Sequence, residues 1–503
     1  MELGYNQQLA PSGATLAYNG NISAVQWSTG SGVASKKQFY SYTYDQMNRL
    51  LSSTHKAYAQ VAGWTTESNA YQENITEYDL NGNIKKLKRT GYLGQLIDDL
   101  NYTYDGNQLL YVNDAGNAAK GFVNLNTGTD DYHYDYNGNL DKDKNKAIDN
   151  NGNIKYNHLN LPIEITKSSG EKLKYIYDAS GKKLSQIVYD ATGSVTKETN
   201  YVGELIYEAT GGSSMSLKMI NHAEGRVLPD GSTWEYQYYL KDHLGNVRVT
   251  FTPKQVIESN TGTLETANLS TEQSNFLRYA NARRVKSEIF DHTNGSAIGF
   301  SERLNGSANE KYGIARSISV MPGDVINMEV YAKYVDPNSS NWTTAFNTLM
   351  GNISSGNVSY VFDGTSYSTS TSSFTYGGLM TTTGNAGAPK AFLNWIIFDK
   401  DFNFITGGFK GISTAAKEYG QDVAHEKLSQ QITAPEAGFI YIYLSNEETT
   451  PVEVYFDNFK VEQIKSPLVQ VDDYYPFGLA FNSYSRGELS APEFEIQWEG
   501  RTN

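Results

Sequence analysis

The chain has 503 residues, among them 45 Gly, 38 Tyr and no Cys. Without cysteine it can form neither disulfides nor thiolate metal sites, and a formal net charge of −14 argues against nucleic acid or an anionic membrane surface as a partner. This abundance of tyrosine and glycine, with only 19% charged residues, favours a β-rich protein.

Neither a membrane span nor an export signal is predicted. The sequence contains no apolar run long enough to cross a bilayer. Residues 1–5 lack the basic and then apolar layout of a secretory signal peptide, so the chain as written is not expected to export itself. The absence of cysteine does not exclude secretion, but a secreted form would take its rigidity from another source.

A short unit recurs along the first half of the chain. It consists of tyrosine, aspartate, a turn with glycine and asparagine, and an aliphatic residue. Its consensus positions are Tyr78, Asp79, Gly82 and Asn83 in one copy, Tyr134, Asp135 and Gly138 in another, and Tyr177 and Asp178 in a third. Aspartate begins an Asx-type turn and glycine supplies the positive φ angle of a tight hairpin. One hairpin cannot bury its aromatic face alone, so the units are interpreted as structural parts of a continuous sheet.

Two longer motifs frame a different middle region. Residues 236–250 predict a strand, a turn and a second strand, with Asp242, His243, Gly245 and Asn246 in the turn. Residues 473–478 resume this style with Tyr475, Pro476, Phe477 and Gly478. Between them the Tyr-Asp unit no longer recurs. This change predicts three segments: a repeat region at 1–252, an inserted domain at 253–466 and a continuation of the repeat region at 467–503.

These motifs resemble the Rhs/YD-repeat family, including its Rhs-associated core region, over residues 1–252 and 467–487. In that family the repeats form a spiral β-sheet that closes into a hollow shell around a variable C-terminal segment, often a toxin, and cell-surface relatives use a similar shell for adhesion. The resemblance implies a non-enzymatic shell or scaffold in a secreted polymorphic-toxin-type or cell-surface protein. Its implied location is extracellular or at the cell surface, and its implied partner is a C-terminal toxin or effector segment of a longer parent.

The chain departs from the family pattern after residue 478. The family continues with a Tyr-Asn-Gly-Lys/Gln-Glu element, a further strand and a self-cleavage site with catalytic aspartates. Residues 494–503 here read Phe-Glu-Ile-Gln-Trp-Glu-Gly-Arg-Thr-Asn instead. We hypothesise that a frameshift near Ser490 ended the reading frame early, and we expect a partial shell with a truncated C-terminus and neither toxin nor self-cleavage site.

The inserted region predicts an antiparallel β-sandwich. Alternating or apolar stretches at 312–320, 325–334, 391–399, 439–444 and 454–461 predict strands separated by Gly and Pro turns. A short helix is expected around residues 272–282. The absence of helical crossovers between the strands favours a sandwich over a parallel sheet.

The inserted region resembles carbohydrate-binding-module-like jelly rolls. The resemblance is carried by Arg-Ser-Ile-Ser-Val-Met-Pro-Gly-Asp at 316–324 and Phe-Asp-Asn-Phe-Lys-Val at 456–461. In such modules an aspartate like Asp457, with oxygens near Asn305 and Gly306, holds a structural calcium ion. The alternative is a turn aspartate with local contacts only, and no cofactor is expected to be required.

A glycan site would need exposed aromatic rings beside polar side chains. Trp342, Tyr360, Tyr367 and Tyr376 lie in a stretch rich in Ser, Thr, Asn and Gly. They are the candidates for an alternative function, a cell-surface glycan-binding or adhesion protein that acts through the jelly roll. The competing interpretation is that these aromatics are exposed singly and bind nothing.

No enzymatic motif emerges from the sequence. The seven histidines are scattered without the spacing of a zinc site, and no GxSxG, P-loop or dinucleotide-binding glycine motif lies in a fitting context. A glycosidase would need two convergent carboxylates, which cannot be singled out among so many turn aspartates. The chain is therefore predicted not to be an enzyme.

Overall fold

The computed structural model describes the chain except residues 10, 12, 29–36, 60–62, 66–68, 150–151, 293–298, 336–358, 363–364, 369–386, 401, 403, 419–422 and 488–503. The chain divides into two compact units. Unit 1 comprises Met1–Lys254 and Val469–Ser483, and unit 2 comprises Gln255–Leu468 and Tyr484–Asn503. Unit 2 thus interrupts unit 1 in the sequence, and the residues after Ser483 belong to unit 2 again.

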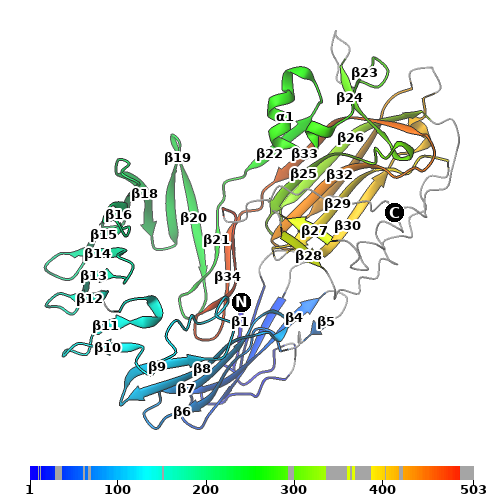
Figure 1. The fold of residues 1–503 in the computed structure, drawn as a ribbon. Coiled ribbons are helices and arrows are strands. Elements are labelled where there is room, and N and C mark those ends of the chain that lie inside the picture. The colour runs from blue at the N-terminus through cyan, green and yellow to red at the C-terminus, as the bar shows by residue number, and fades with distance from the viewer. Residues whose placement is uncertain are drawn as a thin grey trace. The chain divides into compact units, whose positions relative to one another are not determined.

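The described strands of unit 1 form two long antiparallel sheets, with a small hairpin between them in the sequence (Figure 1). The first sheet has β1 (Glu2–Gly4), β2 (Ala24–Ser28), β3 (Lys37–Tyr44), β4 (Leu50–Ala59), β6 (Glu73–Tyr78), β7 (Ile84–Thr90), β8 (Leu96–Asp105) and β9 (Gln108–Asp114) in this order, with β5 (Gly63–Thr65) paired to β4. The hairpin consists of β10 (Tyr132–Tyr134) and β11 (Leu140–Asp143).

The second sheet of unit 1 contains strands from both sides of the insertion of unit 2 in the sequence. Its order is β12 (Asn153–Tyr156), β13 (Pro162–Thr166), β14 (Lys172–Tyr177), β15 (Lys183–Tyr189), β16 (Val195–Val202), β17 (Leu205–Thr210), β18 (Ser216–His222), β19 (Gly225–Asp230), β20 (Thr233–Lys241), β21 (Val247–Phe251), β34 (Leu468–Tyr474) and β35 (Ala480–Ser485). Strand β21 before the insertion and β34 after it are neighbours in this sheet.

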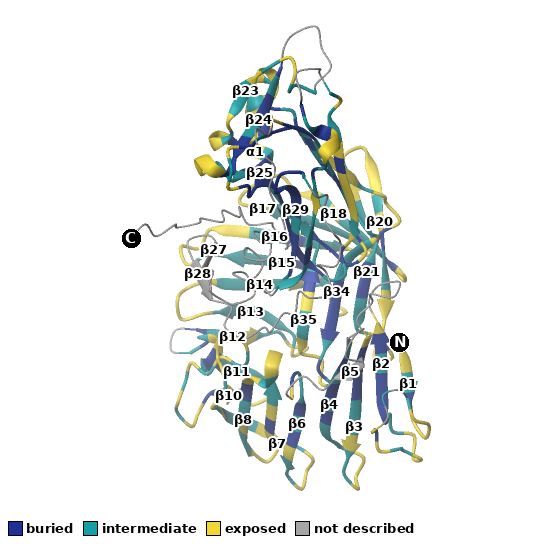
Figure 2. Cartoon of the chain, turned by 90° about the vertical axis from the view of Figure 1, so that its right-hand side faces the viewer, coloured by how far each residue is buried: buried dark blue, intermediate teal, exposed yellow. Residues whose placement is uncertain are grey.

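Burial differs between the two sheets of unit 1. In the first sheet Ile75, Leu87, Leu100 and Val112 form a buried cluster across β6 to β9, because each occupies the same face of its strand. Most residues of β13–β17 are only half-buried (Figure 2). The strands of the second sheet are therefore stabilised mainly by pairing with their neighbours.

Unit 2 is an antiparallel β-sandwich (Figure 1). One sheet has the order β23 (Arg284–Lys286), β24 (Phe300–Asn305), β33 (Glu453–Ile464), β26 (Val325–Val335) and β31 (Glu426–Thr433), with β22 (Ile257–Gly262) paired to β33. The other has the order β25 (Tyr312–Val320), β32 (Gly438–Asn446), β29 (Ala391–Asp399) and β30 (Phe404–Gly411). A separate hairpin contains β27 (Ser359–Phe362) and β28 (Thr365–Ser368).

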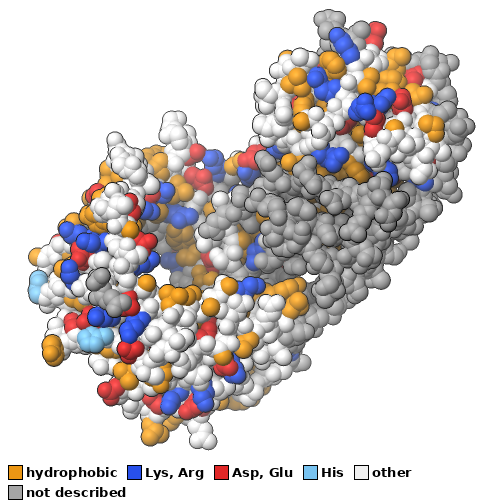
Figure 3. Space-filling model, in the orientation of Figure 1, with side chains coloured by type: hydrophobic (Ala, Val, Ile, Leu, Met, Phe, Trp, Pro, Cys, Tyr) orange, Lys and Arg blue, Asp and Glu red, His pale blue; other side chains and the backbone are white. Residues whose placement is uncertain are grey.

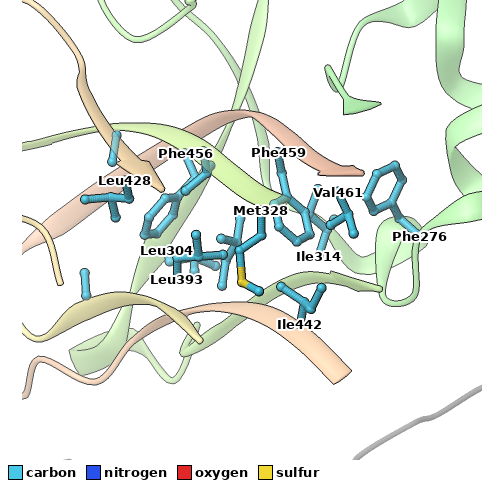
Figure 4. Packing of buried hydrophobic residues seen from close by; sticks show 14 of the residues in the cluster. Phe276, Leu304, Ile314, Met328, Leu393, Leu428, Ile442, Phe456, Phe459 and Val461 are labelled. Atoms are coloured by element: carbon cyan, nitrogen blue, oxygen red, sulfur yellow. The ribbon is translucent and has the colours of Figure 1, made fainter. Parts of the chain in front are cut away.

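The core of unit 2 lies between these two sheets. Met328 on β26 and Phe456 on β33 point into it from one sheet, and Leu393 and Ile442 point into it from the other (Figure 4). Alternate residues of β26 face inward, and the apolar run of β29 is almost wholly buried. The predictions of an all-β fold and of an antiparallel sandwich in the inserted region are therefore confirmed.

The helix of unit 2 differs from its prediction. In the described part of the chain, the one α-helix is α1 (Leu269–Asn275), which begins before the predicted segment and ends well before residue 282. It ends early because Phe276 is extended and Arg278 adopts a positive φ of 61°. None of the described helices has the length and apolarity needed to cross a membrane.

Candidate functional site

The turn of a Tyr-Asp unit is held by its aspartate, as Asp79 demonstrates. Its Oδ1 accepts hydrogen bonds from the backbone N–H groups of Asn81 at 2.9 Å and Asn83 at 2.8 Å. Gly82 closes the turn with a φ of 91°, which favours glycine. Partial desolvation acts to raise the pKa of Asp79, but these hydrogen bonds outweigh it, so the pKa lies below its ordinary value. The aspartate therefore acts as a charged acceptor within its own turn.

Other Tyr-Asp units repeat this arrangement. The same Oδ1 contacts, to the N–H groups two and four residues on, occur at Asp45, Asp135, Asp178, Asp190 and Asp242. The glycines Gly138, Gly181 and Gly245 have φ angles of 82°, 87° and 88°. Within the turn of residues 242–246, His243 is exposed. These predicted repeat residues thus take part in turns and strand ends.

Sequence reasoning missed one turn of this series. Asn157 occupies the aspartate position, and its Oδ1 accepts from the N–H groups of Leu159 at 2.9 Å and Leu161 at 3.0 Å. Asn160 takes the place of glycine with a φ of 56°. The signal was present as Tyr-Asn followed by a second asparagine, since asparagine both accepts these bonds and tolerates positive φ.

Tyrosine hydroxyls connect successive turns. Seven tyrosines that directly precede a turn each donate to a carbonyl at or near the start of the strand after an earlier turn. The bonds are Tyr44 to Ile22, Tyr78 to Leu50, Tyr104 to Ile84, Tyr134 to Leu109, Tyr156 to Leu140, Tyr177 to Pro162 and Tyr474 to Val247, with O···O distances of 2.6–3.0 Å. We call this set the tyrosine ladder. It explains why tyrosine, and not phenylalanine, occupies the repeat position.

The segment 474–479 is a further copy of the same turn, with Tyr475 at the aspartate position. The N–H of Tyr475 donates to the carbonyl of Leu479, and the N–H of Gly478 donates to the carbonyl of Tyr475, both at 2.8 Å. The same two bonds close the turn of Asp79. Gly478 has a φ of 86°. The hairpin of β34 and β35 is therefore another Tyr-Asp-type unit in which tyrosine replaces aspartate.

With tyrosine in place of aspartate, this turn forms hydrogen bonds to the first sheet of unit 1. The hydroxyl of Tyr475 donates to the carbonyl of Thr90 at 2.7 Å. The N–H of Phe477 donates at 2.9 Å to Glu73, a buried carboxylate. Glu73 also accepts from Nε of Arg89 at 2.5 Å, and Arg89 contacts the buried Asp98 at 2.9 Å. Unit 1 thus uses a buried acid-base-acid cluster to hold its last turn.

A second buried cluster joins the two long motifs of unit 1. Nε of Arg248 donates to Asp242 at 3.1 Å, and its Nη1 lies 3.6 Å from Asp473. Asp473 also accepts from the indole Nε1 of Trp27 at 2.6 Å and from Nδ2 of Asn482 at 3.0 Å. Burial raises the pKa of Asp473, although the donors Asn482 and Trp27 favour its charged form.

These clusters fit a structural role better than a chemical one. Each carboxylate of Glu73, Asp98 and Asp473 is buried and accepts hydrogen bonds from groups of the same unit. Breaking a buried pair leaves an uncompensated charge, so such pairs fix one arrangement of their elements. Sequence reasoning missed Trp27, Glu73, Arg89 and Asp98, because their partners lie in distant parts of the chain.

The predicted calcium ligands of unit 2 have local partners. Oδ2 of Asp457 accepts from the N–H of His292 at 2.6 Å, and Oδ1 of Asn305 accepts from Oγ of Ser307 at 2.8 Å. The strand register places Asp457 opposite Tyr331 and Asn305 opposite Glu453, so the two are not brought opposite each other. Among the described residues, no group of three His, Asp or Glu side chains is arranged to hold a metal ion. Structural calcium stays a prediction.

The four aromatic residues predicted to bind glycan cannot be assembled into a site. Trp342 and Tyr376 lie outside the described residues. Tyr360 and Tyr367 are opposite each other in the hairpin of β27 and β28, where the structure describes the backbone only. Their role in glycan binding therefore stays a prediction.

Unit 2 has a polar groove on the outer face of the sheet that contains β31, β26 and β33. Its volume is about 470 Å³, and it is lined by Asn327, Met328, Glu329, Lys427, Ser429, Gln430, Gln431, Lys460 and Glu462. Lys427 pairs with Glu329 at 2.6 Å, and Asn327 donates to Glu462 at 3.1 Å. Tyr331 follows Glu329 on this outer face, and the His292 ring stacks on it at 3.5 Å between centroids. We call this feature the outer groove.

Charges of both signs are mixed among the described residues on the face shown in Figure 3. Figure 3 shows Lys and Arg side chains beside Asp and Glu on the visible face of each unit. Pairs such as Lys155 with Glu164 at 2.8 Å and Lys197 with Glu208 at 2.7 Å bridge neighbouring strands.

Comparisons with known proteins give distant likenesses only. No family model and no curated protein matches the chain. A crystal structure of TcdB2-TccC3 without its hypervariable C-terminal region is 14% identical, with a TM-score of 0.32, over 50% of this chain and 13% of that one. The likeness thus spans only a small share of the length of that structure's chain.

Two sugar-related structures also show a likeness. An exo-β-1,3-galactanase from Phanerochaete chrysosporium is 8% identical over 89% of this chain and 98% of its own, with a TM-score of 0.17. A structure of carbohydrate-binding modules from the β-sandwich superfamily is 8% identical over 57% of this chain and 96% of its own, with a TM-score of 0.15. These likenesses are too distant to assign a function to this chain.

Proposed function

We propose that the chain is a non-enzymatic scaffold of the Rhs/YD-repeat type, and that unit 1 is a segment of the shell of a longer parent protein. The segment helps to enclose a C-terminal effector or toxin part of that parent. The parent is secreted or displayed at the cell surface. Unit 2 is an insertion carried by the shell.

The tyrosine ladder carries this proposal. It recurs at turns in both long sheets of unit 1, including the hairpin of β34 and β35, and it uses consensus residues for backbone contacts. Hairpins that each bind their neighbour in the same way can extend a sheet by any number of units. Such a sheet suits the wall of a shell better than it suits a catalytic pocket. The buried carboxylates of Glu73 and Asp473 are likewise used for internal contacts.

The coding DNA on both sides of this reading frame tests the proposal. We expect further Tyr-Asp units upstream and a family-like continuation with a C-terminal segment downstream, in frame or one base shifted. The longer chain should then protect its C-terminal segment from added protease, while the same segment expressed alone is cleaved. Flanking DNA without such units, or a fully exposed segment in the longer chain, would contradict the scaffold proposal.

A second candidate function is glycan binding through unit 2, and the outer groove favours it. The groove offers amide, hydroxyl and ammonium groups from Asn327, Ser429, Gln431 and Lys460 on one sheet face. Such groups form hydrogen bonds with sugar hydroxyls. This candidate moves the glycan site from the predicted loop aromatics to the face of the sandwich.

A glycan array probed with the full chain tests this candidate. A positive glycan should lose binding in the Gln431→Ala variant and keep it in Arg283→Ala, since Arg283 is exposed and lies outside the groove. An array without signal would remove the glycan function and leave the scaffold proposal untouched. Binding that survives Gln431→Ala and Asn327→Ala would place the sugar elsewhere.

A further inference from the structure

The charged side chains of the outer groove pair with one another. Nζ of Lys427 on β31 lies 2.6 Å from the carboxylate of Glu329 on β26. Nζ of Lys460 lies 3.5 Å from the carboxylate of Glu462, and both residues are on β33. In the register of β26 and β33, Glu329 stands opposite Lys460. Ammonium and carboxylate groups therefore alternate across the three strands, and the charges of the residues that line the groove sum to zero.

Amide side chains connect the same three strands. Nε2 of Gln431 donates to Oδ1 of Asn327 at 2.7 Å, and Nδ2 of Asn327 donates to Oε1 of Glu462 at 3.1 Å. These residues form one row across the sheet, because Asn327 is opposite both Gln431 and Glu462 in the register. An amide has two N–H groups and a carbonyl oxygen, so each amide keeps hydrogen-bonding capacity for a ligand after these bonds have formed.

We propose that the outer groove recognises an uncharged oligosaccharide and discriminates against sugars that carry a carboxylate or a sulfate group. This inference names the ligand class of the glycan-binding function proposed above for unit 2 and rests on that function. A sugar hydroxyl can both donate and accept a hydrogen bond. It can therefore bond to the second N–H of Gln431, to its amide oxygen or to a carboxylate of the groove without separating an ion pair.

An acidic sugar would have to compete for the cations of this groove. Its anionic group loses hydration on entering, which costs free energy unless a cation compensates it. Lys427 and Lys460 already neutralise the carboxylates beside them. An anion that takes one of these lysines leaves Glu329 or Glu462 uncompensated in a partly buried position. We therefore expect an anionic sugar to bind more weakly than its uncharged counterpart.

A glycan array with matched pairs of probes tests the inference on the full chain. Each uncharged probe is printed beside an acidic counterpart: fully methyl-esterified homogalacturonan with its free acid, xylan with glucuronoxylan, and lactose with sialyllactose. Salt at about 0.15 M screens charges that are more than about 8 Å apart, so distant charges of the chain contribute little. We expect at least one uncharged probe to bind and its acidic counterpart to bind about tenfold more weakly.

Two variants with the same change in net charge test whether the groove causes this preference. Glu329→Gln leaves Lys427 without its carboxylate, so binding of the acidic counterpart should rise about fivefold relative to the uncharged probe. Glu258→Gln removes an exposed carboxylate on β22. Glu258 is opposite Gln463, the neighbour of Glu462, so its side chain points away from the groove. The Glu258→Gln variant should keep the preference of the parent chain.

The outcomes separate this inference from the glycan-binding function itself. Acidic probes that bind the parent chain as tightly as their uncharged counterparts would overturn the inference and leave the glycan-binding function in place. Equal changes of the preference in Glu329→Gln and Glu258→Gln would also overturn it, because the net charge of the chain would then explain the effect. An array without signal would remove the glycan-binding function and this inference with it.

Discussion

The hydroxyl of Tyr474 donates a hydrogen bond of 2.9 Å to the carbonyl of Val247, although unit 2 lies between the two residues in the sequence. Tyr177 makes the equivalent bond to Pro162 at 3.0 Å within an uninterrupted part of the same sheet. The insertion therefore falls between two consecutive units of the repeat and leaves their contact intact. The turn of Tyr475 is the direct successor of the turn of Asp242.

Removal of one ladder hydroxyl should weaken unit 1 measurably. In Tyr78→Phe the carbonyl of Leu50 loses its donor at 2.6 Å, and we expect a loss of about 1 kcal/mol in the free energy of unfolding. Tyr136→Phe serves as the control because its side chain is fully exposed in a turn. Urea unfolding of both variants measures the difference. Equal stability of the two would contradict a structural role for the ladder.

The buried contact of Asp473 with Trp27 and Arg248 should be sensitive to truncation. Asp473→Ala leaves the indole N–H without its acceptor and removes one of the two carboxylates beside the largely buried guanidinium of Arg248, and we expect a destabilisation of about 3 kcal/mol. Asp473→Asn keeps an acceptor for Trp27 and should lose less. Unfolding followed by tryptophan fluorescence measures both, with the exposed Asp105→Ala as a control. An alanine variant as stable as this control would refute the contact.

The stability of unit 2 should depend on pH through Glu302. Burial raises the pKa of Glu302 from its ordinary 4.5 to about 7, and a hydrogen bond from Ile314 opposes this only in part. The folded state thus holds the proton more tightly than the unfolded chain, so this contribution to stability is present at low pH and is lost as the pH rises through about 7. The loss amounts to about 3 kcal/mol between about pH 4 and about pH 8.

Glu302→Gln tests this dependence because glutamine can still accept the Ile314 bond without a charge. The variant should be more stable than the parent at about pH 8 and should lose the slope between about pH 4.5 and about pH 7. Glu288→Gln, at an exposed position, should keep the parent's slope. Urea unfolding of unit 2 in the full chain over this pH range decides the point, and an unchanged slope in Glu302→Gln would contradict it.

Arg486 should stabilise unit 2 although it follows the last strand of the sheet in unit 1. Its Nη1 and Nη2 each lie 2.9 Å from the carboxylate of Asp324, which is fully buried. Burial opposes the charge of Asp324, and the hydrogen bonds from Arg486 outweigh it, so the pKa of Asp324 is lowered.

Arg486→Ala should therefore cost about 3 kcal/mol, because it leaves a buried carboxylate without its cation. Arg283→Ala, which removes a largely exposed side chain from its pair with Glu310, should cost about 1 kcal/mol or less. Thermal unfolding of the two variants provides the comparison. If Arg486→Ala unfolds at the same temperature as Arg283→Ala, the ion pair between Arg486 and Asp324 contributes little to stability.

The sequence predicts much of the fold because its signals are local. Alternation in residues 325–334 and the apolar run at 391–399 depend on neighbouring residues, and both became strands close to their predicted limits. The start of the helix was predicted wrongly because the Glu272 side chain does not cap the backbone at that point. Its carboxylate accepts from the N–H groups of Thr263 and Leu264, which precede the helix.

The junction of unit 1 was harder to predict because its partners are far apart in the sequence. Asp473 lies in a recognisable motif, but nothing near Trp27 indicates that its indole N–H reaches this carboxylate. Tyr475 likewise occupies the aspartate position of a turn. Because it is a tyrosine, the sequence does not show that this turn is a copy of the Tyr-Asp turns. Contacts of this kind follow from the path of the whole chain and not from local patterns.

Removal of unit 2 tests the central claim most directly. A variant in which a short Gly-Ser linker replaces residues 255–467 keeps β21, β34 and β35, which are consecutive neighbours in the sheet. We predict that it unfolds cooperatively and that the amides of β34 and β35 remain protected from hydrogen exchange. Unprotected amides in β34 and β35 of a variant whose first sheet stays folded would contradict the claim that the repeat continues across the insertion.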